Sequence, residues 1–116
     1  MTPDDNSNWV RVCEAWAVQP GEIHPARLPD DTPIALYCIG DRYFATADTC
    51  THADASLSCD GTVKDGLVVC NWHDGAFDIA SGNAVELPCV VPLRTYAVEV
   101  RGEDLFVLAP TRSAAG

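Results

Sequence analysis

Two short cysteine–histidine pairs are the residues of this chain best suited to metal chemistry. Cys50 and His52 form a Cys-x-His pair, Cys70 and His73 form a Cys-x-x-His pair, and 17 residues (53–69) separate the two. Thiolate and imidazole groups are ligands both for zinc and for iron–sulfur clusters. Because each pair supplies two ligands, the spacing predicts one four-ligand metal centre held between two loops.

The distribution of ligand types favours an iron–sulfur cluster over zinc. Zinc fingers usually keep a cysteine pair apart from a histidine pair, with the histidines on a helix. Here each half contributes one cysteine and one histidine, and small residues such as Ala53, Ala55 and Gly75 flank them. Small residues let backbone amides approach an inorganic centre closely. A zinc-stabilised binding module without redox activity remains open as the alternative.

Strands of a single small domain are expected to position the pairs. The chain has 116 residues, of which 47% are hydrophobic and 21% charged, as in a soluble folded domain. Short runs separated by turn signals are typical of an all-β sandwich or barrel. The expected strands are Trp9–Cys13, Glu22–Arg27, Pro33–Ile39, Tyr43–Ala47, Leu67–Cys70, Ala76–Ile79, Thr95–Arg101 and Asp104–Leu108.

Turn residues predict how several of these strands are joined. Asp65-Gly66 is a strong hairpin signal between Thr62–Lys64 and the strand that begins at Leu67. Gly40-Asp41 and Gly102-Glu103 predict two further hairpins. No segment has a sustained helical period, apart from one expected turn near Glu14–Val18.

The charge of the chain restricts its partners. Seventeen acidic and seven basic residues give a formal net charge of -10. Affinity for phosphate comes mainly from Lys and Arg, so we expect neither nucleic acid nor an anionic membrane surface as a partner. We expect instead that its partners are proteins with basic surface patches.

The sequence contains no stretch that approaches the roughly 20 apolar residues of a spanning helix. Residues 1–8 have neither a basic start nor an apolar segment. We therefore expect a cytoplasmic location.

The two pairs and their surroundings resemble the signature of Rieske [2Fe–2S] proteins. The resemblance continues through Cys50–Ser58 to Arg94-Thr95-Tyr96, and over roughly residues 8–109 the chain looks like the soluble ferredoxins of bacterial aromatic-ring dioxygenase systems. This resemblance implies an antiparallel Rieske-type β-sandwich with a small cluster-binding subdomain at its tip. The cluster-binding loops would lie within about residues 48–89, with flexible termini at 1–7 and 110–116.

The resemblance also implies a cofactor and a role. It implies one [2Fe–2S] cluster, with Cys50 and Cys70 as thiolate ligands of one iron and His52 and His73 as imidazole ligands of the other. It implies a monomeric one-electron carrier and not an enzyme. Electrons would pass from a flavin-containing ferredoxin reductase to the Rieske centre of a terminal aromatic-ring-hydroxylating oxygenase. The alternative is the Rieske small subunit of an assimilatory nitrite reductase.

Departures from the pattern of high-potential Rieske proteins predict a low reduction potential. Those proteins have a disulfide between the cluster loops, and the equivalent positions here are Ala55 and Trp72. Their Ser and Tyr hydroxyls near the cluster are replaced by Gly75 and Phe77. Donors to cluster sulfur stabilise the reduced state, so their absence lowers the potential. Asn71 occupies a position where the family commonly has Pro. The next residue, Trp72, is expected either in the core or on a docking surface.

Four cysteines lie outside the two pairs, at positions 13, 38, 59 and 89. Cys38 lies in an apolar strand and is expected to be a buried thiol. Cys89 follows Pro88 in a segment that resembles the proline loop covering the cluster in this family. Cys59 and Cys89 remain open as additional ligands or disulfide partners. The remaining histidine, His24, is expected to be structural or solvated.

Overall fold

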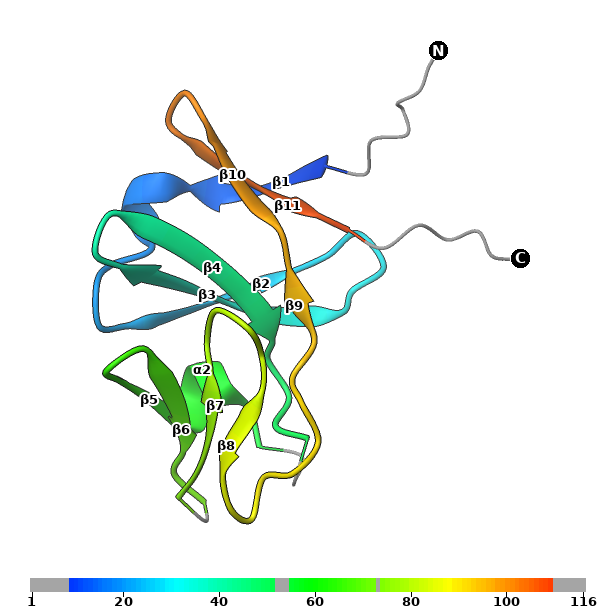
Figure 1. The fold of residues 1–116 in the computed structure, drawn as a ribbon. Coiled ribbons are helices and arrows are strands. Elements are labelled where there is room, and N and C mark those ends of the chain that lie inside the picture. The colour runs from blue at the N-terminus through cyan, green and yellow to red at the C-terminus, as the bar shows by residue number, and fades with distance from the viewer. Residues whose placement is uncertain (1–8, 52–54, 73, 110–116) are drawn as a thin grey trace.

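The computed structural model describes residues 9–51, 55–72 and 74–109, and these residues form three antiparallel sheets (Figure 1). The expected all-β class and antiparallel architecture are confirmed. The expected flexible termini lie outside the described residues. The elements in chain order are β1 (Trp9–Glu14), the 3-10 helix η1 (Ala15–Ala17), β2 (Ile23–Arg27), β3 (Pro33–Ile39), β4 (Arg42–Ala47), α2 (Leu57–Asp60), β5 (Gly61–Lys64), β6 (Leu67–Cys70), β7 (Gly75–Asp78), β8 (Ala84–Glu86), β9 (Thr95–Tyr96), β10 (Val98–Arg101) and β11 (Asp104–Leu108).

The first sheet has the strand order β1-β11-β10, the second β2-β3-β4-β9 and the third β5-β6-β7-β8. Figure 1 shows the first two sheets packed together, with the third sheet and α2 as a smaller unit at the lower end. The sandwich core lies between the first two sheets and includes Ile34, Leu36, Ala45, Leu105 and Val107. The tip core lies against the third sheet and includes Tyr37, Leu57, Val68, Phe77, Ile79 and the cysteines 50, 70 and 89.

Strand β3 is buried on both faces because it separates the two cores. Ile34 and Leu36 pack in the sandwich core, whereas Ala35 and Tyr37 pack in the tip core. Successive side chains of a strand point to opposite faces of the sheet. A strand covered on both faces therefore needs an almost continuous apolar sequence, which is what Pro33–Ile39 provides.

The hairpins form at the turn residues that the sequence indicated. Asp65 and Gly66 have φ angles of 53° and 80° and join β5 to β6 in register. Two successive residues with positive φ match the right-handed twist of the flanking strands. The turns at Gly40 and Gly102 also have positive φ at the glycine. The helical turn expected near Glu14–Val18 is the helix η1.

Three parts of the fold differ from the expectation. The segment Thr95–Arg101 is divided into β9, which pairs with β4, and β10, which pairs with β11. The chain passes from the second sheet to the first at Ala97, so one alternating segment serves two sheets. The short helix α2 and the strand β8 were not expected, because four and three residues are too few to carry a periodic signal.

No helix in the described part of the chain is long and apolar enough to cross a membrane.

Candidate metal centre

The first cysteine–histidine pair lies in the loop between β4 and α2. Cys50 is buried, and its N–H donates to the carbonyl of Ala55 at 2.9 Å. Thr49 and Ser56 form an isolated antiparallel bridge at the base of the same loop. These bonds close the loop upon itself and fix the backbone of Cys50. His52 lies outside the described residues.

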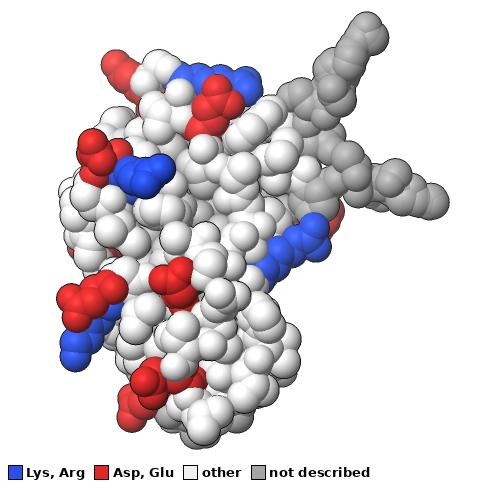
Figure 2. Space-filling model, viewed as in Figure 1, with Lys and Arg blue, Asp and Glu red and all other residues white. Residues whose placement is uncertain are grey.

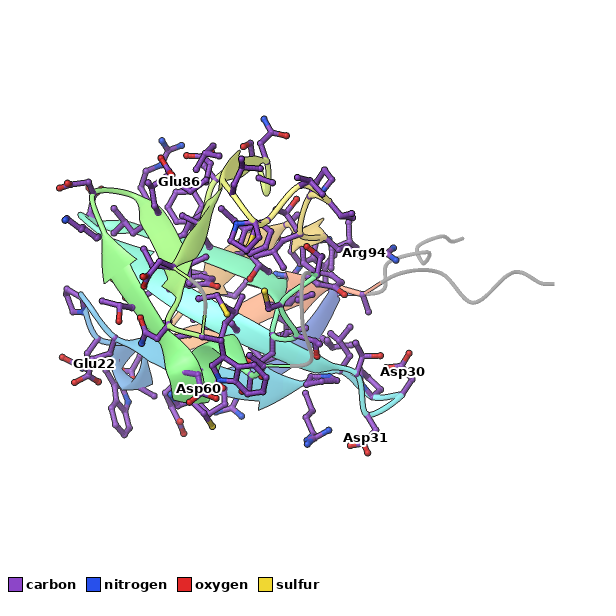
Figure 3. The ribbon with its side chains drawn as sticks, turned by 90° about the horizontal axis from the view of Figure 1, so that it is seen from below. Glu22, Asp30, Asp31, Asp60, Glu86 and Arg94 are labelled. Atoms are coloured by element: carbon purple, nitrogen blue, oxygen red, sulfur yellow. The ribbon has the colours of Figure 1, made fainter. Side chains whose placement is uncertain are left out.

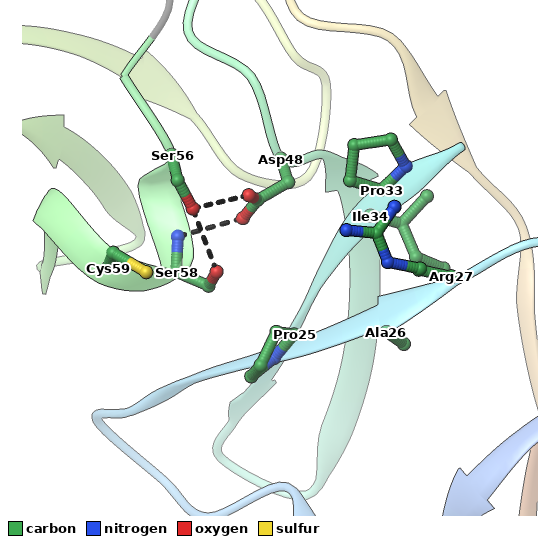
Figure 4. Close-up of a pocket in the computed structure, with 9 residues that line it drawn as sticks. All are labelled: Pro25, Ala26, Arg27, Pro33, Ile34, Asp48, Ser56, Ser58 and Cys59. Atoms are coloured by element: carbon green, nitrogen blue, oxygen red, sulfur yellow. Dashed lines mark hydrogen bonds between the residues drawn. The ribbon is translucent and has the colours of Figure 1, made fainter. Parts of the chain in front are cut away.

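A buried carboxylate anchors both ends of this loop. Asp48 is buried and accepts hydrogen bonds from the hydroxyl of Ser56 and, at 2.8 Å, from the N–H of Ser58 (Figure 4). Its own carbonyl accepts from the N–H of Leu57 at 2.7 Å. Figure 4 shows these groups at one side of a cavity of about 310 Å³, which Arg27 and Cys59 also line. Asp48 thus joins the start of the loop to the helix that follows it.

Two buried side chains near Asp48, those of Tyr37 and Thr46, form a hydrogen-bonded pair. The hydroxyl of Tyr37 lies 2.8 Å from that of Thr46, and the Thr46 hydroxyl donates to the carbonyl of Ala47 at 2.9 Å. Tyr37 is therefore the donor to Thr46. Burial raises the pKa of Tyr37, and the nearby Asp48 adds to this shift. The phenol consequently stays protonated and continues to donate.

The second cysteine–histidine pair lies at the turn between β6 and β7. Cys70 ends β6, is buried and pairs with Gly75 across the turn. The N–H of Asp74, which has a φ of 63°, donates to the carbonyl of Cys70 at 2.8 Å. His73 lies outside the described residues. The two predicted cysteine ligands are thus brought into one core by two separate loops, whereas the two predicted histidines are not described.

Asn71 makes contacts that a proline at this position could not make. Its backbone N–H donates to the carbonyl of Asp60 at 2.8 Å, and its side-chain oxygen accepts from the hydroxyl of Thr62 at 3.1 Å. Proline has no N–H to donate. The departure from the family pattern therefore links the second loop to the end of α2 and to β5.

A third segment reaches the buried sulfurs. The Sγ atom of Cys89 lies 4.0 Å from that of Cys50, and the hydroxyl of Thr51 donates to the carbonyl of Val91 at 2.6 Å. Burial raises the pKa of the Cys89 thiol, and Cys50 and Cys70 raise it further. The sequence left Cys89 open as a ligand or disulfide partner. All six cysteines are free, and Cys59, which is exposed, lies on α2.

Exposed apolar side chains surround this end of the molecule. Trp72 is 53% exposed and Leu87 74%, and Val85, Val90 and Val91 are also exposed. These five residues are called the apolar rim below. Of the two alternatives expected for Trp72, this exposure excludes burial in the core and leaves the docking surface, because the turn between β6 and β7 directs the side chain outward. Figure 2 shows the lower end of the molecule as largely uncharged, with acidic residues to one side.

Two acidic residues lie at the ends of elements in the smaller unit, Asp60 in α2 and Glu86 in β8. Figure 3 labels both in a view from below, together with Glu22, Asp30, Asp31 and Arg94, which belong to segments next to β2, β3 and β9. Negative charge is thus present on the unit that contains the metal centre.

The described part of the centre fits an iron–sulfur cluster. Cys50 and Cys70 present two buried thiols from facing loops to one apolar core, and thiolates are the ligands that such clusters use. Among the described residues, no three His, Cys, Asp or Glu side chains form a group that could hold a metal ion. Both predicted histidine ligands fall outside those residues, so the complete four-ligand set stays a prediction.

The chain is similar in sequence to ferredoxins of dioxygenase systems. The ferredoxin component of the p-cumate 2,3-dioxygenase system of Pseudomonas putida is 43% identical over 103 residues, which cover 89% of this chain and 87% of that relative. Ferredoxin CarAc of Metapseudomonas resinovorans is 41% identical and covers 88% of this chain and 94% of its own length. These relatives are electron-transfer components and not catalytic subunits.

Solved structures have the same fold. The ferredoxin of Sphingomonas yanoikuyae B1 superimposes with a TM-score of 0.83 at 32% identity, covering 89% of this chain and all of that one. A protein described as a nitrite reductase small subunit from Mycobacterium tuberculosis reaches a TM-score of 0.77 at only 22% identity, covering 90% of this chain and 96% of its own, which shows a shared fold alone. Residues 8–97 match the Rieske [2Fe-2S] domain. The chain therefore belongs to the Rieske [2Fe–2S] family of iron–sulfur proteins.

Proposed function

We propose that this protein is a one-electron carrier. It accepts electrons from a flavin-containing ferredoxin reductase and delivers them to the Rieske centre of a terminal aromatic-ring-hydroxylating oxygenase. The observation that carries the proposal is the burial of Cys50 and Cys70 in one core, within the smaller unit that also carries the exposed apolar rim. The similarity to dioxygenase ferredoxins supports it, as does a solved complex of oxygenase and ferredoxin in carbazole 1,9a-dioxygenase whose matched chain is 41% identical, with a TM-score of 0.80.

The proposed ligands divide between the two loops. Cys50 and Cys70 bind one iron of a single [2Fe–2S] cluster, and His52 and His73 bind the other. The cluster supplies one-electron redox chemistry when it is bound. With two thiolates, two neutral imidazoles, two sulfides and two ferric ions, its formal charge is zero, so reduction produces a single negative charge. An all-cysteine cluster would pass from -2 to -3, which explains why imidazole ligation raises the potential.

The residues around the proposed ligands hold them in place. Asp48 fixes the first loop to α2, and Asn71 fixes the second loop to the end of the same helix. Both anchors meet at Leu57–Asp60, so one short element sets the separation of the two loops. A site whose ligands are held by hydrogen bonds from rigid elements keeps its geometry when its charge changes.

The apolar rim is the proposed contact surface for both redox partners. Exposed apolar patches with polar surroundings are typical of protein–protein interfaces. The acidic groups around the rim attract partners with basic patches and orient the encounter. The proposal includes a monomeric carrier in the cytoplasm, which was the expectation from the sequence.

The proposal is tested by reconstituted electron transfer. The holoprotein is mixed with a reduced flavin-containing reductase and a terminal oxygenase from a related dioxygenase system, and reduction of each Rieske centre is followed by stopped-flow absorbance. We expect product formation to require this chain. Turnover that is the same without it, or co-purification of the chain with a large sirohaem subunit, would contradict the proposal.

A further inference from the structure

A third thiol lies within hydrogen-bond distance of a proposed ligand. Cys89 is only 3% exposed, and its Sγ lies 4.0 Å from the Sγ of Cys50, a residue 39 positions away. Both sulfurs belong to the tip core together with Cys70. Of the cysteines outside the proposed ligands, Cys13 and Cys38 pack in the sandwich core and Cys59 is exposed. The arrangement thus distinguishes Cys89 from the cysteines at positions 13, 38 and 59.

The direction of this hydrogen bond follows from the ligand role of Cys50. A cysteine that binds iron is a thiolate and has no proton, so it can only accept. Cys89 is the unligated member of the pair and carries the S–H donor. We propose that Cys89 is a positioning residue whose thiol donates a hydrogen bond to the Cys50 sulfur and thereby raises the reduction potential of the cluster. The inference rests on the proposed function, because it requires Cys50 to be a ligand.

The backbone around Cys89 holds the thiol in this position. The N–H of Cys89 donates to the carbonyl of Glu86 at 3.1 Å. Two residues further on, the carbonyl of Val91 accepts from the hydroxyl of Thr51 at 2.6 Å, and Thr51 is the neighbour of Cys50. The segment that carries Cys89 is therefore tied directly to the loop that carries the proposed ligand.

The space for the thiol exists because residue 75 is glycine. A Cβ atom at Gly75 would lie 2.4 Å from the Sγ of Cys89, which is closer than such atoms approach, and 3.1 Å from its backbone nitrogen, which is a tight contact. The sequence indicated that Gly75 lacks the hydroxyl donor of high-potential Rieske proteins. The structure shows that the thiol of another segment lies in the space that a side chain there would occupy.

The effect on potential follows from charge. Reduction adds negative charge to the cluster and its ligand sulfurs, and a donor to one of those sulfurs stabilises the reduced state more than the oxidised state. The S–H group is a weak donor, so the effect is modest. The thiol partly offsets the absence of hydroxyl donors at positions 75 and 77.

The inference is tested on the holoprotein with a matched set of variants. Cys89→Ala removes the donor, and Cys89→Ser keeps one. Cys38→Ala is the control, because Cys38 is a buried thiol in the sandwich core and its S–H donates to the carbonyl of Gly40. Each variant is checked for two irons and two sulfides per chain. The reduced-to-oxidised ratio is then measured at a fixed solution potential, and the EPR spectrum is recorded.

The expected result has three parts. Cys89→Ala keeps the mixed Cys/His EPR spectrum and lowers the reduced-to-oxidised ratio about threefold to tenfold; tenfold corresponds to about 59 mV for a one-electron couple. Cys89→Ser lowers it less, and Cys38→Ala leaves it unchanged. In the unmodified holoprotein, transfer to D₂O shifts an iron–sulfur stretching frequency in the resonance Raman spectrum, and Cys89→Ala reduces that shift. This last measurement does not depend on the folding of the serine variant.

Several results would overturn the inference. An unchanged ratio in Cys89→Ala would show that the thiol does not act on the cluster. An equal loss in Cys89→Ser and Cys89→Ala would show that the thiol acts through packing. Loss of the cluster in both variants would show that Cys89 is itself a ligand or a structural requirement. A wild-type chain that holds no [2Fe–2S] cluster would refute the proposed function instead, before any variant is compared.

Discussion

The carboxylate of Asp48 accepts a 2.8 Å hydrogen bond from the backbone N–H of Ser58, across the loop that contains Cys50. Asp48→Ala leaves that partly buried donor without its partner, at a cost of about 1–3 kcal/mol. For a domain of about 100 residues, we expect the midpoint of thermal loss of the visible absorbance to fall by about 5–15 °C. Asp41→Ala, at the exposed turn between β3 and β4, is the control. Equal midpoints in the two variants would show that Asp48 does not support the loop.

The ligand set predicts which histidines hold the cluster. Purified protein is expected to be brown-red, with two irons and two sulfides per chain and a reduced-state EPR spectrum of the mixed Cys/His type. His52→Ala and His73→Ala lose the cluster or this spectrum, because each removes one of two imidazole ligands. His24→Ala, on β2, retains both. Stoichiometric zinc without sulfide in fresh anaerobic protein would replace the cluster assignment with a zinc site.

The close approach of Gly75 to Cys89 predicts a rescue. Gly75→Ala introduces a Cβ that meets the Cys89 sulfur at 2.4 Å, and overpacking of this kind costs about 1–3 kcal/mol. We expect faster cluster loss at a fixed temperature. The double variant Gly75→Ala with Cys89→Ala loses the cluster more slowly than Gly75→Ala alone, because the clashing sulfur is gone. Strictly additive effects of the two substitutions would contradict the contact.

Two exposed tryptophans allow a matched test of the apolar rim. Trp72 lies in the rim at 53% exposure, and Trp16 lies in η1 at 67% exposure, at the other end of the molecule from the third sheet (Figure 1). Removal of an aromatic residue from an interface centre commonly costs more than 1 kcal/mol. We expect Trp72→Ala to raise the KM of the oxygenase for the carrier about tenfold, and Trp16→Ala to leave it unchanged. Similar effects from both variants would place the contact elsewhere.

The net charge predicts a response to salt. Electron transfer from the reductase is expected to slow as the ionic strength rises past about 0.1 M, where the Debye length is about 10 Å. The reason is the formal charge of -10, which attracts basic partners. The rate is measured by stopped flow at constant pH. Rates that are flat from low to high salt would show that the interface depends on the apolar rim alone.

The sequence predicts those features of the fold that depend on residues adjacent in the chain. Asp65-Gly66 predicts its hairpin because these two residue types are favoured where a turn needs positive φ at both positions, and both have positive φ in the structure. The apolar run of β3 indicates a strand, although not that its two faces belong to different cores. The division at Ala97 was missed because only the partners β4 and β11 decide which residues pair.

For the candidate site too, the sequence predicted what depends on local spacing and not what depends on tertiary packing. The spacing of the cysteine–histidine pairs predicts Cys50 and Cys70 as ligands, because a metal centre requires specific ligand types, and the structure places both residues in one core. The contact between Cys89 and Cys50 spans 39 residues and depends on tertiary packing, so no local pattern reveals it. The only sequence feature connected with this contact was Gly75. From the sequence alone, Gly75 indicated only that a hydroxyl donor near the cluster is missing.

The chain leaves the second sheet at the end of β4 and returns to it in β9, the strand that pairs with β4. The N–H of Ala47 donates to the carbonyl of Arg94 at 2.8 Å, so the exit and the return are adjacent. Residues 48–94 are therefore an insert with a two-stranded stem in a frame formed by the first two sheets. The insert packs against Ala35 and Tyr37 of β3 and against the partly buried Ile23, Ile39 and Phe44. Exchanging this insert between relatives, with these contacts matched, would transfer redox and docking properties onto an unchanged frame. Residues 48–94, which contain the proposed electron-transfer site, can therefore be exchanged as one unit.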